Sequence, residues 1–217
     1  MDHGVNSDSG PTLWLRRLLK VWGVLVAVVV VVGVLAVNQP PLAEAPEEYG
    51  TVPAFSLTDQ QHNAYGSEQL HNGVWVANFI FTRCKTVCPM FSAKMADVQT
   101  RLQTDNKDVA LVSFSVDPDF DTPAVLAEYA KRFDANPEQW RFLTGPSAAI
   151  RTVVVDGMKM HMEDANTVER PEDLMHGSHF VLVDGTHTIR GFYNVNDADT
   201  IERLMRDIDH LVAPDGT

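Results

Sequence analysis

Seventeen consecutive residues without a charge, Val21–Val37, divide this chain of 217 residues into two unequal parts. The segment reads VWGVLVAVVVVVGVLAV, and its many valines would make it a poor helix in water. Inside a bilayer every backbone polar group must be paired within the segment, which imposes a helix. Seventeen residues is near the short limit for a span. We therefore expect one transmembrane anchor over residues 21–37.

Charges on the two sides of this segment predict its orientation. Three basic residues precede it and three acidic residues follow it: Arg16, Arg17 and Lys20, then Glu44, Glu47 and Glu48. Basic residues stay on the cytoplasmic side, so residues 1–20 are expected in the cytoplasm and the rest beyond the inner (plasma) membrane, in a periplasm. The alternative is a cleaved signal peptide with its cleavage site at Leu42–Ala45, although the apolar run is longer than a usual signal core.

The remainder of the chain has the composition of one folded domain. Residues 38–50 are rich in Pro, Ala and Glu and are expected to form an extended linker, which leaves residues 51–217 for the domain. Hydrophobic residues make up 45% of the chain and charged residues 21%, as is usual for globular proteins. Because 29 acidic residues outnumber 17 basic ones, nucleic acid is not an expected partner.

Apolar runs and breakers predict alternating strands and helices after residue 50. The expected strands are Ala54–Leu57, Gly73–Phe81, Val109–Val116, Trp140–Leu143, Phe180–Val183 and Thr188–Tyr193. The expected helices are Pro89–Leu102, Ala124–Phe133, Ser147–Val155 and Ala198–Leu211, with Thr122 as the N-cap of the second and Pro123 at its first position. A βαβ unit followed by ββα predicts an α/β, thioredoxin-like fold, in which helices flank a central mixed sheet.

Cys84 and Cys88 are the only cysteines, and they directly follow the buried strand predicted at Gly73–Phe81. Sites in open α/β sheets form at this end of a strand. On a helix the two thiols would lie on one face, and a helix amino terminus favours the thiolate. Two thiolates form a soft site that suits Cu(I) and also Zn. A structural disulfide, a redox-active pair and a metal site all remain open, although a disulfide here closes only a very short loop.

A metal site at the cysteines requires further ligands, and histidine is the candidate. The chain has eight histidines, and most of them fall in predicted turns or near the chain ends, where they are expected to be solvated. His161, His176 and His179 remain. His176 precedes the strand predicted at Phe180–Val183, whose neighbours bring its start near the cysteines. A histidine in a loop is, however, more often a surface residue than a ligand.

Methionines crowd the stretch before His176: Met158, Met160, Met162 and Met175, together with His161. Thioethers and imidazole are ligands for Cu(I), so this stretch could form a second, transient copper site. The alternative is a strand edge in which methionine fills gaps in the core.

Three motifs carry a resemblance to a known family. They are FTRC-x-x-x-CP at Phe81–Pro89, SVDPDFDTP at Ser115–Pro123, and a histidine eight residues before Asp184 of the VLVDG turn. With these motifs, residues 50–212 resemble the Sco/SenC family, whose members are membrane-anchored, thioredoxin-fold proteins that handle copper for cytochrome c oxidase assembly.

The resemblance implies a copper site. It implies that Cys84, Cys88 and His176 bind copper, as Cu(I) or Cu(II). His179 adds a second imidazole three residues on and is the alternative ligand. Asp117 matches an acidic position near the family's site, and we expect it to act as a turn residue rather than as a ligand.

The resemblance also implies a function and partners. The protein is expected to be a metallochaperone, not an enzyme, that delivers copper to the copper-bearing subunit of cytochrome c oxidase. Its other expected partners are a copper donor protein, a thiol reductant and the membrane. Two alternatives stay open. In one, Cys84 and Cys88 act as a redox-active pair that reduces the target's metal-binding cysteines. In the other, the protein is a copper or redox sensor.

Overall fold

The structure is a computed structural model that describes residues 18, 20–26, 28–30, 47–85, 87–162 and 178–213. The chain forms two compact units, Met1–Glu44 and Ala45–Thr217. In the first unit the described residues are helical and their apolar side chains are exposed, Trp22 most of all at 73%. Among all described residues, no helix combines the length and the apolar character that a membrane crossing needs. The predicted span over residues 21–37 lies partly outside the described residues and stays a prediction.

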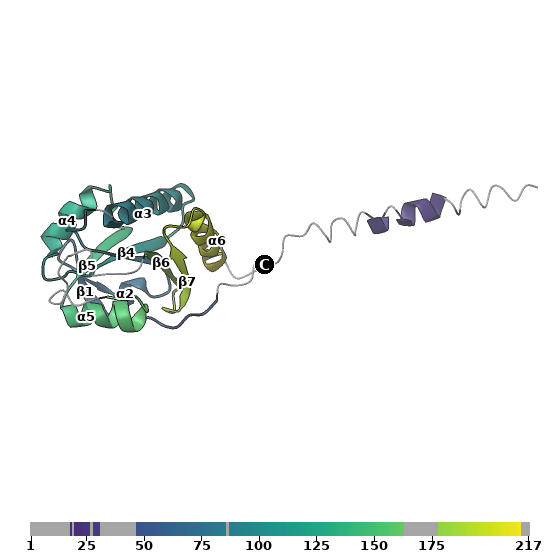
Figure 1. The fold of residues 1–217 in the computed structure, drawn as a ribbon. Coiled ribbons are helices and arrows are strands. Elements are labelled where there is room, and N and C mark those ends of the chain that lie inside the picture. Colours follow the sequence, from purple (N-terminus) through teal and green to yellow (C-terminus); the bar gives the residue numbers. More distant parts are fainter. Residues whose placement is uncertain are drawn as a thin grey trace, which may run out of the picture. The chain divides into compact units, whose positions relative to one another are not determined.

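The described strands of the second unit form one mixed sheet of seven strands (Figure 1). They are β1 (Ser56–Asp59), β2 (Ala64–Gly66), β3 (Val74–Ile80), β4 (Val109–Ser115), β5 (Trp140–Thr144), β6 (His179–Val183) and β7 (Ile189–Asn194). Their order is β2-β1-β5-β4-β3-β6-β7. The central strands β3, β4 and β5 are parallel, and the remaining pairs are antiparallel. The predicted mixed sheet is confirmed.

Helices cover both faces of this sheet, as predicted (Figure 1). The helical elements are α2 (Ser67–Leu70), α3 (Val87–Thr104), α4 (Pro123–Lys131), α5 (Ser147–Arg151), the π-helical turn η1 (Thr152–Gly157) and α6 (Thr200–Val212). Apolar residues of α3, α4 and α6 form one core cluster with one face of the sheet, and those of α5 and η1 form a second cluster with the other face.

Strand β3 shows why the sheet lies at the centre of the domain. All seven of its residues are buried. Trp75, Ala77 and Phe79 belong to the cluster under α5, whereas Val76 and Ile80 belong to the cluster under α3. Successive side chains of a strand point to opposite faces, so a continuous apolar run fits a strand that is covered on both sides.

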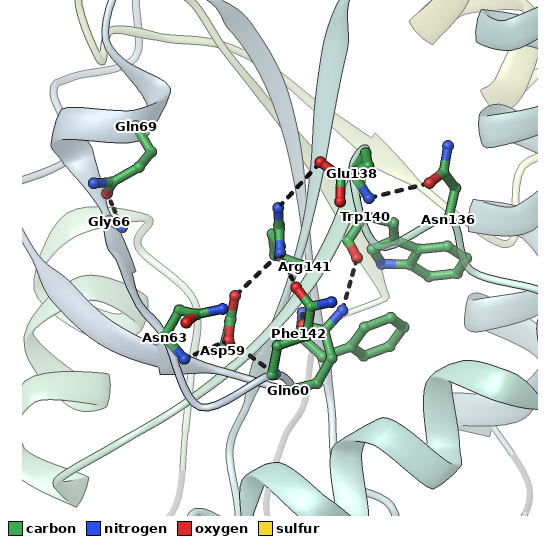
Figure 2. Close-up of polar contacts among 11 residues, drawn as sticks. Asp59, Gln60, Asn63, Gly66, Gln69, Asn136, Glu138, Trp140, Arg141 and Phe142 are labelled. Carbon is green, nitrogen blue, oxygen red and sulfur yellow. Dashed lines mark hydrogen bonds and ion pairs between the residues drawn. The ribbon is translucent and has the colours of Figure 1, made fainter.

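A side-chain clasp joins the end of β1 to β5 (Figure 2). The Gln60 side-chain amide donates to the Trp140 carbonyl at 3.1 Å and accepts from the Phe142 amide at 2.9 Å. Beside it, the buried carboxylate of Asp59 accepts a hydrogen bond from Arg141 at 3.2 Å. The Gln60 amide thus pairs with the part of β5 that the short strand β1 does not reach.

Several predicted boundaries are confirmed and others are wrong. Thr122 caps α4 by accepting a hydrogen bond from the Val125 amide, and Pro123 begins the helix, as predicted. The strand expected at Ala54–Leu57 lies two residues later. The helix expected over Ser147–Val155 changes to a π-helical turn at Thr152, where consecutive β-branched residues follow.

Candidate functional site

The two cysteines lie where β3 leaves the sheet and α3 begins. The Cys84 amide donates to the Phe81 carbonyl at 3.1 Å and forms a turn, and Cys88 is the second residue of α3. Cys84 therefore lies outside the helix, so the prediction that both residues share a helical face is wrong. Helix α3 begins at Val87 because Pro89 is tolerated in a first turn, where its missing N–H has no partner to lose.

Cys84 and Cys88 form no disulfide and both are almost buried, with 6% of Cys84 and 4% of Cys88 exposed. The Cys88 backbone N–H donates to the Cys84 sulfur at 3.3 Å. This contact aims the first turn of the helix at the sulfur of Cys84, which is an arrangement that stabilises negative charge on sulfur.

Burial has the opposite effect on the second cysteine. It raises the pKa of the Cys88 thiol far above its ordinary value, and the nearby Cys84 and Asp121 raise it further, against a backbone hydrogen bond at Phe81. The Cys88 thiol therefore holds its proton at neutral pH. A thiophilic ion that takes this sulfur must displace the proton, so metal loading here releases protons.

A buried carboxylate holds the turn before Cys84. Asp121 is fully buried and accepts from the Thr82 amide at 3.1 Å, from the Thr82 hydroxyl at 2.5 Å and from the Ser115 hydroxyl at 2.6 Å. Burial raises the pKa of Asp121, and the hydrogen bonds from Ser115 and Thr82 oppose that rise. These bonds join the Cys84 turn to the end of β4.

A second carboxylate of the same loop holds the next residue. Both the Nε and an Nη of Arg83 donate to one oxygen of the buried Asp117, at 2.8 and 2.6 Å. The guanidinium also lies over the Phe120 ring, 4.7 Å from its centroid. The Asp117 carbonyl accepts from the amides of Phe120 and Asp121, so the predicted turn role is confirmed. The ion pair with Arg83 is an additional role.

Sequence analysis did not identify Thr82, Arg83 or Asp121 as part of this site. Thr82 and Arg83 lie in the FTRC motif and Asp121 in the SVDPDFDTP motif, so the motifs contained the signal. The hydrogen bonds between the two motifs join residues more than thirty positions apart, so the sequence alone did not predict them.

Three exposed apolar side chains lie close to the cysteines in the sequence or are joined to the Cys84 turn. Among the described residues of the second unit, the large apolar side chains that are exposed are Tyr49, Val87, Met90 and Phe120. Val87 and Met90 flank Cys88 in the sequence, and Phe120 is joined to the Cys84 turn through Arg83. These three side chains are the candidates for a contact surface beside the cysteines.

The third predicted ligand, His176, lies outside the described residues. The alternative, His179, is the first residue of β6, is partly exposed and pairs with Asn194 of β7. Among the described residues, no three histidine, cysteine or acidic side chains lie close enough together to hold a metal ion. His179 therefore does not complete a three-ligand site with the two thiols in this structure.

The methionines before His176 are core residues where the structure describes them. Met158 is fully buried, and Met160 and Met162 are 9% and 6% exposed. All three belong to the core cluster that also contains both cysteines. This placement agrees with methionine filling gaps in the core, but Met158 and Met160 lie in no strand, so the strand edge predicted there is wrong; Met175 lies outside the described residues.

The SCO1/SenC family model matches residues 43–213 of this chain. The chain belongs to the SCO1/SenC family. This match covers the whole described part of the second unit, including the turn that carries Cys84 and the loop that carries Asp117 and Asp121. The family predicted from the motifs is therefore confirmed.

Individual relatives agree with this assignment. A SCO1 protein homolog of Bacillus subtilis is 32% identical over 157 residues, which is 72% of this chain and 80% of the relative. The structure of BsSco, described as a member of the Sco family of cytochrome c oxidase assembly proteins with a disulfide switch, has a TM-score of 0.68 at 30% identity and covers 79% of this chain and 98% of that one. Copper-bound ScoI of Arabidopsis thaliana has a TM-score of 0.61 at 25% identity, with 73% of this chain and 98% of that one covered.

Proposed function

We propose that this protein is a copper metallochaperone that acts in the assembly of cytochrome c oxidase. The observation that carries the proposal is the pair of reduced, nearly buried thiols at the carboxyl end of β3, in a chain of the SCO1/SenC family. Relatives described as copper-bound and as oxidase assembly proteins support copper as the cargo and the oxidase as the destination.

We infer that His176 supplies the third ligand beside Cys84 and Cys88. Strands β3 and β6 are antiparallel, with Ala77 opposite Val181. The start of β6 is therefore at the end of β3 that leads to Cys84, and His176 precedes β6 by three residues. Two thiolates and an imidazole suit both Cu(I) and Cu(II).

Delivery requires that an acceptor reach the two sulfurs. They are nearly buried, and we expect an acceptor thiolate that displaces them from copper to approach beside the exposed side chains of Val87, Met90 and Phe120. Arg83, which lies over the Phe120 ring and is ion-paired with Asp117, presents a partly exposed guanidinium beside Phe120. We expect the copper-bearing subunit of the oxidase to dock here. A copper donor and a thiol reductant would use the same opening.

A membrane anchor over residues 21–37 would hold the domain near such a target. The exposed apolar side chains of the described helical residues, including Val21, Val24 and Leu25, support this part of the proposal. In this arrangement residues 1–20 are cytoplasmic, residues 38–50 form a linker, and residues 51–217 lie on the periplasmic side. Tethering raises the effective concentration of the domain at a membrane-bound partner.

A second function, thiol–disulfide exchange, is favoured by the contact between Cys84 and Cys88. The Cys84 thiolate would attack a disulfide of the target, and Cys88 would then release the reduced target by closing a disulfide with Cys84. Two electrons pass to the target, whose two sulfurs leave as thiols. A separate reductant would then restore Cys84 and Cys88.

The test is copper titration of the reduced full chain, with the thiolate-to-copper charge-transfer band as the signal. We expect one tightly bound copper ion in the wild type and loss of the band in Cys84→Ser and Cys88→Ser. His176→Ala should weaken binding strongly, whereas His179→Ala, the matched control, should not. If His176→Ala binds copper as the wild type does and still reduces a disulfide peptide, the exchange function is favoured over copper delivery.

A further inference from the structure

Two histidines meet at the end of β3 that is opposite to the cysteines. His71 directly follows α2, and His187 lies in the turn between β6 and β7. Their ring centroids are 5.9 Å apart and the ring planes are inclined by 43°. Sequence analysis treated both as ordinary turn residues, and the proposed copper delivery uses neither of them.

The two turns that carry these histidines are locked to each other. The Asn72 amide donates to the Gly185 carbonyl at 2.9 Å. The backbones touch so closely that a Cβ on Gly185 would lie 2.7 Å from the Asn72 Cα. The backbone contacts therefore hold the two turns that carry the imidazoles side by side, and the side-chain rotamers set the final ring separation.

The backbone of His187 is itself fixed in an uncommon conformation. Its φ is +64°, its amide donates to the Asp184 carbonyl at 2.9 Å, and its own carbonyl accepts from the Val52 amide at 2.9 Å. Residues other than glycine are uncommon in this left-handed region, and asparagine, aspartate and histidine are the ones enriched there.

The His187 ring packs against the buried core. It packs edge-to-face against the fully buried Trp75 ring, with centroids 6.4 Å apart. Its Nδ1 is buried and has no hydrogen-bond partner among the described residues. Coordination by this ring therefore falls to Nε2. His71 is exposed, so its ring can rotate to share a ligand.

The ring separation fits a shared metal ion. An imidazole nitrogen lies about 2.0–2.1 Å from a bound zinc ion, and the ring centroid lies roughly 1 Å behind that nitrogen. Two rings on one ion therefore have centroids roughly 5 Å apart at a tetrahedral angle and up to roughly 6.4 Å apart when they are opposed. The observed 5.9 Å lies within this interval.

We propose that His71 and His187 bind a divalent first-row transition ion, with water as the remaining ligands. Imidazole suits Cu(II) and Zn(II), and Cu(II) binds more tightly than Zn(II) to a given nitrogen site. The seven residues of β3 separate this pair from the cysteines by roughly 20 Å, so the two sites fill independently. The site differs from the dithiol in its preference, because it lacks the thiolates that hold Cu(I).

The experiment uses the full chain with Cys84→Ser, Cys88→Ser and His3→Ala, which removes the dithiol and the histidine near the amino terminus. Zn²⁺ and Cu²⁺ are added in equilibrium dialysis, and tryptophan emission is followed during the Cu²⁺ titration. We expect one equivalent that is lost in both His71→Gln and His187→Asn. Bound Cu²⁺ should quench part of the emission, since Trp75 contacts the His187 ring.

His62→Asn is the matched control, because His62 is an exposed histidine in another turn and its φ of +66° is close to that of His187. Asparagine tolerates this conformation, so both variants should keep the wild-type circular dichroism and thermal midpoint. The proposal is overturned if His71→Gln and His187→Asn bind as many equivalents as their parent, or if His62→Asn loses the same equivalent. Because the parent already lacks both thiols, the result does not depend on whether the dithiol binds copper as the proposed function requires.

Discussion

Removing the Asp121 carboxylate should loosen the turn that carries Cys84. Asp121 is fully buried and accepts hydrogen bonds from three donors, which are the amide and the hydroxyl of Thr82 and the hydroxyl of Ser115. A hydrogen bond to a charged group contributes about 1.5–3 kcal/mol, and buried donors left without an acceptor carry a penalty of about 1–3 kcal/mol. The two hydroxyls can rotate toward other acceptors, and the buried charge itself disappears. We therefore expect Asp121→Ala to lower the free energy of unfolding by about 3 kcal/mol.

The assay is urea unfolding of the reduced protein, followed by tryptophan emission, alongside copper titration. Asp121→Asn keeps the shape and one acceptor oxygen, so it should lose only about 1 kcal/mol and retain most of the copper band. Asp119→Ala, in the same loop but exposed, is the control and should change neither quantity. If Asp121→Ala is no less stable than Asp119→Ala, or if it binds copper as the wild type does, the carboxylate does not hold the turn.

Three further changes test other contacts of the site and the fold. Arg83→Met leaves the buried Asp117 carboxylate without its ion pair, and since Arg83 is partly exposed we expect a loss of about 1–2 kcal/mol in urea unfolding, with Arg83→Lys losing less. In Asp184→Asn the free energy of unfolding should fall less between pH 7 and pH 3 than it does in the wild type. Burial raises the Asp184 pKa, but hydrogen bonds from Thr186, Arg190 and Thr188 outweigh burial and hold it below its ordinary 3.8. The ionised carboxylate therefore stabilises the fold fully above that value, and this stabilisation is lost as pH falls through the lower pKa. The prediction is contradicted if the urea midpoint changes between pH 7 and pH 3 by the same amount in the wild type and in Asp184→Asn. Replacing the exposed Met90 by Ser should change stability by less than about 0.5 kcal/mol but slow copper transfer to an acceptor protein in stopped-flow absorbance, and an unchanged rate would remove Met90 from the docking surface.

The sequence predicted best those elements whose signal is local. The continuous apolar run after Gly73 and the Thr122–Pro123 helix start are each complete within a few residues, and both are confirmed. Strand β2 and helix α2 were missed because they are three and four residues long, too short for a periodic pattern to appear.

The candidate site also has parts that the local sequence predicts and parts that only the fold brings together. The two cysteines and their position after β3 follow from the sequence alone. The hydrogen bonds from Thr82 to Asp121 join residues 39 apart, and no local pattern indicates such a pairing. His71 and His187 are separated by an even longer stretch of sequence. They meet because the turn before β3 is hydrogen-bonded to the turn after β6.

The Gln60 clasp has a consequence for a protein that would be confined to a membrane surface. With its amide on the Trp140 carbonyl and the Phe142 amide, no free backbone pair is left there for a neighbouring chain to extend. A neighbouring copy therefore cannot extend this part of β5, and any strand pairing between copies is left to β2 and β7, the two edge strands of the sheet.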